Sequence, residues 1–216
     1  QLLEAAREIY SRGWTTLKLY FMIGHPSETL EDVQEIADLA KAVLAEGRKV
    51  MGGKAKLNVG VSTFVPKPHT PFQWSPSDSF EQIELKQRLL RREVRGRGLK
   101  LNLNKPHETM MESWLSRGDR RLGKVILEAY KNGAKFDGWW EHFNYRAWIR
   151  AFEKCGLDTE FYTHRERKGD EVLPWDHIDS AVKKSFLLED YQWSQEGETR
   201  IDCRDQCFAC GILPQF

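Results

Sequence analysis

Residues 14–24, WTTLKLYFMIG, and residues 56–65, KLNVGVSTFV, decide the fold of this chain. The first stretch is a run of apolar, aromatic and β-branched side chains, which is typical of a buried strand. Alternate residues of the second stretch form an apolar face: Leu57, Val59, Val61, Thr63 and Val65. The other face is smaller and more polar, with Asn58, Gly60, Ser62 and Phe64. This pattern predicts a barrel strand with helices outside and a ligand space inside.

Helical patterns surround both strands. Residues 2–12 have apolar side chains at helical spacing and end at Gly13. The residues Thr29-Leu30-Glu31-Asp32 fit a capping box for a helix that we expect to end at Glu46-Gly47, before a mobile loop over 47–55. A charged amphipathic helix is predicted from about Phe80 to Arg95, and a short strand over residues 99–104. Helices and strands therefore alternate, which indicates an α/β fold with parallel strands.

The character of the chain changes beyond residue 107. Segments 108–132, 142–155 and 176–189 have helical patterns and contain most of the tryptophans. We expect core packing for most of the aromatic group Trp139, Trp140, Trp148, Trp175 and Trp193, with an aromatic substrate wall as the alternative. The predicted domains are residues 1–106, an α-rich subdomain over 107–195 and a Cys-rich tail over 196–216.

Composition limits the class of protein. The chain has 216 residues, 40% of them hydrophobic and 30% charged, and its formal net charge is +1. No global charge attracts it to nucleic acid or membrane, and no apolar run has the length that a membrane helix needs. The four cysteines do not form a spread disulfide framework, which favours a reducing, cytoplasmic location. The chain begins with Gln in a helical pattern, so we expect a piece of a longer protein.

Two motifs follow the predicted strands. Gly24-His25-Pro26-Ser27-Glu28 comes after the first strand, and FVPKPHTPF, residues 64–72, comes after the second. In a parallel barrel the active-site groups lie at the carboxyl ends of strands. The alternatives are a tight turn with an N-cap for the first motif and a rigid edge loop for the second. His69 is a candidate acid or base, although a lone loop histidine more often has neither role.

The two motifs together resemble a known family. LKLYFMIGHPSET and VGVSTFVPKPHTPFQW resemble the fifth and sixth βα units of radical SAM barrels. They are especially similar to the branch with tRNA and ribosomal-protein methylthiotransferases and cobalamin-binding relatives. The stretches 112–158, 173–179 (LPWDHID) and 202–211 (DCRDQCFACG) resemble a bacterial family with an N-terminal cobalamin-binding-type domain, a radical SAM barrel and this C-terminal region.

The resemblance implies a partial radical SAM (TIM-like) barrel and its cofactors. These are SAM and a [4Fe–4S] cluster whose ligands lie outside this fragment, with cobalamin in the parent as a further candidate. The parent would cleave SAM reductively and modify an unknown substrate, with methyl or methylthio transfer to RNA or protein as the candidate reactions. The fragment itself is expected to be inactive. A small partner domain of unknown function, fused or encoded nearby, and an RNA or ribosomal substrate are the implied partners, and no membrane is implied.

The same resemblance assigns cofactor-binding residues. Ile23, Gly24 and Glu28 would lie near the methionine or ribose of SAM. Ser62, Phe64 and Val65 would lie near its adenine or ribose.

Three cysteines in the tail form a separate candidate site. Cys203, Cys207 and Cys210 have the spacing of a radical SAM cluster motif. In the resembled family that motif follows the first strand, so we expect a second metal site here. Thiolates suit both an Fe–S cluster and zinc, and the spacing leaves the two open. Candidate fourth ligands are Cys155, His164 and His177, and unliganded thiols or a disulfide are the alternatives.

Two arginine groups suggest anionic ligands. The run Arg88, Arg91, Arg92, Arg95 and Arg97 could contact an RNA backbone, although a solvated helix face explains it better. The arginines of residues 117–121, RGDRR, could bind phosphate or a carboxylate, with surface ion pairs as the alternative. Two rival functions therefore stay open. One is a non-enzymatic, metal-stabilised module that binds RNA or ribosomes, and the other is a barrel enzyme for a phosphorylated metabolite.

Overall fold

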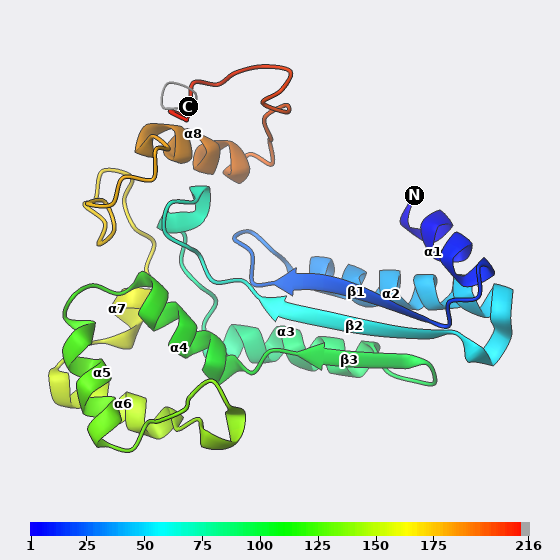
Figure 1. Ribbon diagram of the computed structural model, residues 1–216, viewed down its shortest axis with the longest axis horizontal. Coiled ribbons are helices and arrows are strands. Elements are labelled where there is room, and N and C mark those ends of the chain that lie inside the picture. Colours follow the sequence, from blue (N-terminus) through cyan, green and yellow to red (C-terminus); the bar gives the residue numbers. More distant parts are fainter. Residues whose placement is uncertain (213–216) are drawn as a thin grey trace. The chain divides into compact units, whose positions relative to one another are not determined.

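The chain forms two compact units in a computed structural model, which describes residues 1–212 (Figure 1). The first unit comprises Gln1–Phe64 and Asp78–Thr109. The second comprises Val65–Ser77 and the residues from Met110 onward. The chain therefore leaves the first unit after Phe64, returns to it at Asp78, and leaves it again within a helix.

A parallel three-stranded sheet organises the first unit. Its elements are α1 (Leu2–Ser11), β1 (Thr16–Ile23), α2 (Leu30–Met51), the 3₁₀ helix η1 (Gly52–Lys54), β2 (Lys56–Thr63), α3 (Phe80–Glu93) and β3 (Leu99–Leu103). The strand order is β1-β2-β3 and both pairs are parallel, with Ile23 beside Thr63 and Val61 beside Leu103. The α/β alternation predicted from the sequence is confirmed. The described strands form an open sheet, without closure into a barrel.

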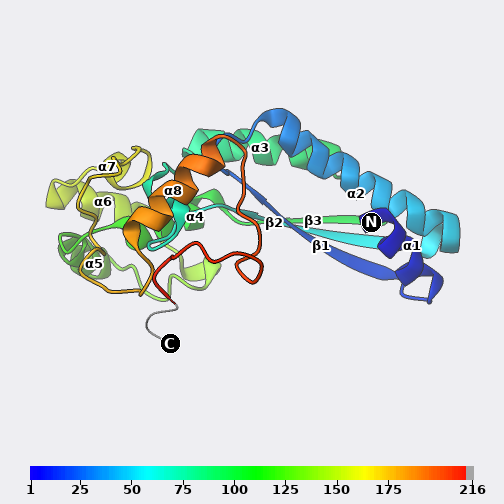
Figure 2. The same cartoon turned by 90° about the horizontal axis from the view of Figure 1, so that it is seen from above.

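Helices cover one face of this sheet. Figure 2 shows α2 and α3 on the same side of the strands. Leu57, Val59 and Val61 of β2 are buried against them, whereas Asn58, Gly60 and Ser62 alternate with these residues and keep partial exposure. The predicted division of β2 into an apolar face and a small polar face is therefore confirmed. The polar face has no helix of the first unit over it.

Helix α2 begins as predicted but ends later. The Thr29 side chain accepts a hydrogen bond from the Asp32 N–H, and the Asp32 carboxylate accepts one from the Thr29 N–H. The expected end at Gly47 is wrong, since α2 continues to Met51 and takes up more than half of the expected mobile loop, and η1 takes up residues 52–54. Gly47 lies against the ring of Tyr10, which a Cβ at this position would approach to 2.6 Å. The glycine is thus needed for packing of α1 on α2, and it does not terminate the helix.

The second unit is helical in its described residues. Its elements are η2 (Pro71–Trp74), most of α4 (Pro106–Arg117), α5 (Leu122–Lys131), η3 (Trp140–His142), α6 (Tyr145–Cys155), α7 (Thr159–Thr163) and α8 (Lys184–Gln195). The single helix expected over 108–132 is interrupted after Arg117. The helix expected from residue 176 starts only at Lys184. The Asp176 carboxylate instead accepts a hydrogen bond from the Leu173 N–H and pairs with Lys184.

A tryptophan-rich cluster forms part of the core of this unit. Trp74, Leu173, Trp175 and Leu187 are buried together, and the Trp175 Nε1–H donates to Gln73 Oε1 at 2.6 Å. Trp148 is also buried. The expectation of core packing fails for Trp139 and Trp140, which are exposed on the segment around η3. Their sequence pattern carried no helical period that would distinguish a buried from an exposed ring.

Candidate functional site

The carboxyl ends of β1 and β2 lie side by side. The Phe64 N–H donates to the Ile23 carbonyl at 2.8 Å, which continues the parallel ladder past both strands. The rings of His25 and Phe64 stack with their centroids 4.3 Å apart. The turn after β1 and Phe64, the first residue after β2, therefore lie together at one edge of the sheet. We call Gly24, His25, Glu28, Phe64, Asp78 and Lys86 the strand-end cluster.

Gly24 has a backbone conformation that suits glycine. Its φ is +88°, and a Cβ there would lie 3.1 Å from the Asp78 Oδ2. The Gly24 N–H donates to the Glu28 carboxylate at 2.6 Å. The turn after β1 is consequently closed by its own glutamate, and a side chain at Gly24 would have to push Asp78 aside.

A buried lysine joins the two acidic residues of this cluster. Lys86 Nζ lies 2.8 Å from Glu28 and 2.7 Å from Asp78, and its side chain is 9% exposed. Burial by itself would lower the pKa of Lys86, but the hydrogen bonds to Asp78 and Glu28 outweigh it, so the pKa is raised. Glu28 therefore holds the loop in place through Lys86 and Gly24, and its Oε2 makes both of these contacts.

The remaining predicted cofactor residues, Ile23, Ser62 and Val65, lie outside the strand-end cluster. Ile23 is buried in the core under the helices, so only its backbone reaches the strand end. Ser62 lies on the polar face and its hydroxyl donates to the Phe21 carbonyl at 3.3 Å. Val65 is buried and is the first residue of the second unit. The Thr63 hydroxyl is buried at the end of β2 and has no hydrogen-bond partner within residues 1–212.

The polar face of the sheet carries a shallow cavity of about 220 Å³. Its polar lining combines two ammonium groups and two side-chain amides, and the Tyr20 ring packs against Gly60, where an added Cβ would lie 3.0 Å from the ring. The lining residues are Lys18, Leu19, Tyr20, Asn58, Gly60, Lys100 and Asn102. Such a surface suits a polar ligand with anionic and hydrogen-bonding groups.

Sequence reasoning missed Asp78 and Lys86. A signal for Lys86 was present, because Ile83, Lys86 and Leu90 stand at helical spacing on the side of α3 that becomes buried. A lysine within an apolar stripe needs a buried carboxylate as its partner. The sequence did not indicate which of the many acidic residues would supply it.

The three tail cysteines are free thiols, and within the described part of the chain they are not arranged as a metal site. Cys203 and Cys207 are exposed and Cys210 is half-buried. Over residues 1–212 no group of three or more His, Cys, Asp or Glu side chains is arranged to hold a metal ion. The Ala209 N–H donates to Cys207 Sγ at 3.5 Å, and the Lys183 N–H donates to the Cys210 carbonyl at 2.8 Å. The Cys207–Cys210 turn is therefore anchored beside the start of α8.

The arginine run on α3 has partners within its own helix. Arg88 lies 3.4 Å from Glu84, Arg92 lies 2.8 Å from Glu93, and Arg91 donates to Gln87. These contacts favour the solvated helix face over a dedicated RNA-contacting surface.

Comparisons with known proteins give one distant relative. No family model and no solved structure matches the chain. A curated protein described as uncharacterized, from Methanocaldococcus jannaschii, is 34% identical over 114 residues. The match covers 53% of this chain and 24% of that protein, so the chain spans about a quarter of the length of its relative. No helix among residues 1–212 combines the length and apolar character required to span a membrane.

Proposed function

We propose that this chain is the C-terminal part of a radical SAM enzyme and that it supplies one wall of the SAM-binding space. One observation carries the proposal. Two adjacent parallel strands end side by side, with His25 of the GHPSE segment stacked on Phe64 at one edge of the sheet and an uncovered polar face leading to them. In α/β proteins ligands bind at the carboxyl ends of strands.

The residues beside the strand ends can form hydrogen bonds with such a ligand, and the two lysines of the cavity, Lys18 and Lys100, can pair with the single carboxylate of SAM. Gly60 and Ser62 place only small side chains on the polar face of β2. Asn58 and Asn102 offer amide groups within the cavity on that face. In this proposal the Gly24 turn, fixed by Glu28, borders the methionine or ribose of SAM. Phe64, stacked on His25, borders the adenine, and Ser62 lies beneath the ribose. Ile23 contributes its backbone alone, because its side chain belongs to the core.

The chemistry comes from the cofactors and the orientation from the protein. With a [4Fe–4S] cluster and an electron, SAM supplies a 5′-deoxyadenosyl radical for hydrogen abstraction. The residues of this chain would position SAM and exclude water from it. Methyl or methylthio transfer to RNA or protein, a cytoplasmic location and a cobalamin cofactor in the parent all belong to this proposal. A second Fe–S or zinc site at the tail cysteines belongs to it as well.

SAM binding by the full 216-residue chain tests the proposal. Equilibrium dialysis with radiolabelled SAM should show saturable binding to the wild type. Ser62→Trp fills the polar face beside the strand ends and should weaken binding by at least about tenfold, since a bulky ring excludes the ligand. Ser11→Trp, at the exposed end of α1, is the matched control and should bind as the wild type does.

Circular dichroism of all three proteins checks that the sheet is intact. A folded chain without saturable SAM binding, or equal binding by the wild type and Ser62→Trp, would contradict the proposal.

A further inference from the structure

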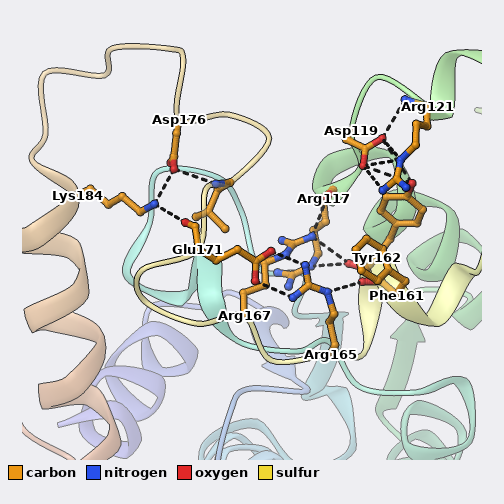
Figure 3. Close-up of polar contacts among 11 residues, drawn as sticks. Arg117, Asp119, Arg121, Phe161, Tyr162, Arg165, Arg167, Glu171, Asp176 and Lys184 are labelled. Atoms are coloured by element: carbon orange, nitrogen blue, oxygen red, sulfur yellow. Dashed lines mark hydrogen bonds and ion pairs between the residues drawn. The ribbon is translucent and has the colours of Figure 1, made fainter.

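Two arginines of the second unit are buried without a carboxylate partner. Arg117, the last residue of α4, is fully buried, and Arg167 is 3% exposed. Arg117 Nε donates to the Tyr162 carbonyl at 3.2 Å, and Arg167 Nη2 donates to the Arg117 carbonyl at 2.9 Å (Figure 3). These carbonyls belong to the C-terminal turns of α4 and α7, whose partial negative charge offsets only part of two full positive charges.

Much of the hydrogen-bonding capacity of the pair is unused. Nη1 and Nη2 of Arg117, and Nε and Nη1 of Arg167, are buried without a partner among residues 1–212. Each guanidinium carries several N–H donors in a fixed planar fork. A buried donor with no acceptor destabilises the folded state, and a buried charge without a counter-charge does so more strongly. These unpartnered groups therefore favour the binding of an anion.

The acidic residues nearby are engaged elsewhere. Asp119 pairs with Arg121 at 2.6 Å, and Glu171 forms a two-point pair with Arg165. Figure 3 shows the Asp119–Arg121 and Glu171–Arg165 pairs together with the buried guanidiniums. Four arginines and two carboxylates line a cavity of about 220 Å³ here, so positive charge exceeds negative charge. We call this cavity the arginine pocket.

Both buried guanidiniums stay cationic at neutral pH. Burial, followed by repulsion from Arg167 and Arg165, lowers the pKa of Arg117 to about 9. Burial and repulsion from Arg165 lower the pKa of Arg167 to about 10. The Trp175 ring, 5.1 Å from the Arg167 guanidinium carbon, gives partial support to that cation.

We propose that the arginine pocket binds a phosphate group, as a phosphomonoester dianion of a small ligand. The doubly charged group balances the excess charge, and its several oxygens can accept from two guanidinium forks at once. A single carboxylate would satisfy only one fork. The cavity of about 220 Å³ exceeds the ~30 Å³ that one water takes up in the liquid, so it has room for more than solvent. This inference does not depend on the proposed binding of SAM.

Glu171 would compete with the incoming anion. Its pairing with Arg165 lies at the partly exposed edge of the pocket, where both side chains retain about 30% exposure, 30% for Arg165 and 28% for Glu171. Glu171 is also close enough to Arg167 for each to shift the pKa of the other. An anion that reaches Arg117 must therefore displace this carboxylate, and it then gains Arg165 as a third cation.

Thermal unfolding of the full chain tests the proposal. Inorganic phosphate and phenyl phosphate should each raise the midpoint saturably above that in chloride at equal ionic strength. Benzoate, the carboxylate counterpart of phenyl phosphate, should not. Arg117→Met and Arg167→Met should weaken the apparent affinity for phosphate by at least about tenfold. Arg150→Met, at an exposed position of α6, is the control and should respond as the wild type does.

A second variant tests phosphate binding if Arg117→Met and Arg167→Met do not fold. Glu171→Gln removes the competing carboxylate and should tighten phosphate binding roughly two- to fivefold, the range expected for loss of a partly exposed ion pair. A wild type with the same midpoint in phosphate and in chloride would overturn the proposal. So would an undiminished phosphate response in a folded Arg117→Met, or unchanged affinity in Glu171→Gln.

Discussion

Gly24 combines a left-handed backbone with a close neighbour, so an added methyl group has two costs. Gly24→Ala should strain the turn at φ +88° and push against Asp78 Oδ2, which an added Cβ would approach to 3.1 Å. We expect a loss of about 1–3 kcal/mol in the free energy of unfolding, measured by urea denaturation.

Gly13→Ala separates the two costs. Gly13 has a similar φ of +92° but no atom within 4 Å of the added Cβ, so it reports backbone strain alone. The loss at Gly24 should be the larger of the two. Equal losses would mean that contact with Asp78 is irrelevant at this turn.

At the level of residues, the sequence indicated positions better than partners. It placed Gly24, Ser62 and Phe64 at adjoining strand ends, because parallel strands bring their carboxyl ends to one edge. It did not reveal that Glu28 is held by Lys86, since that pairing joins segments nearly sixty residues apart and depends on how α3 packs. The RGDRR motif raised an anion-binding interpretation, yet the buried Arg167 that completes the pocket lies 50 positions from Arg117.

The helices and strands were predictable where period and caps agreed. Strand β2 and the start of α2 follow directly from alternation and from the capping box at Thr29. Errors came from residues whose local meaning is overridden by packing. Gly47 is typical of a helix end, but in α2 it gives the Tyr10 ring its space. Asp176 is typical of an N-cap, but it closes a loop that Lys184 then anchors.

The proposed role of the tail segment, residues 196–216, is metal binding, which can be measured directly. We expect the full chain, purified anaerobically and supplied with zinc or with iron and sulfide, to retain metal after desalting. Replacing Cys203, Cys207 and Cys210 together by serine should abolish retention, because the thiolates are the ligands. The Ala209 N–H already donates to Cys207 Sγ, and such a donor also stabilises a thiolate.

Cys155→Ser is the matched control for the tail. Cys155 ends α6, outside the tail segment, and its substitution should leave the metal content unchanged if the three tail thiols suffice. Elemental analysis by mass spectrometry gives the readout. Full metal retention by the triple serine variant would rule out the tail as the site.

At the level of the whole molecule, the chain passes from the first unit into the second at Val65 and returns to the first at Asp78. Segment 65–77 follows β2 directly, yet its Trp74 belongs to the core of the second unit beside Trp175 and Leu187. Sequence order alone suggested that the proline-rich loop stays with the sheet. The segment is instead held in the second unit by a buried hydrogen bond from the Trp175 Nε1–H to the Gln73 side chain. These two residues are separated by 102 positions in the sequence. No local pattern encodes such a pairing.

This arrangement predicts which part of the molecule unfolds first when a substitution weakens the packing of segment 65–77. Trp74 is fully buried, so Trp74→Ala should cost the second unit about 3–5 kcal/mol through the cavity that it leaves. Hydrogen exchange followed by mass spectrometry should show lost protection over residues 71–74 and 184–195, while β1 and β2 stay protected. Trp14→Ala, at a side chain that is 67% exposed, should change neither. Equal loss of protection in β2 and α8 would mean that the two units unfold as one. Trp74 belongs to the core of the second unit, so its loss can expose the amides of β2 only if the unfolding of that unit also unfolds the sheet.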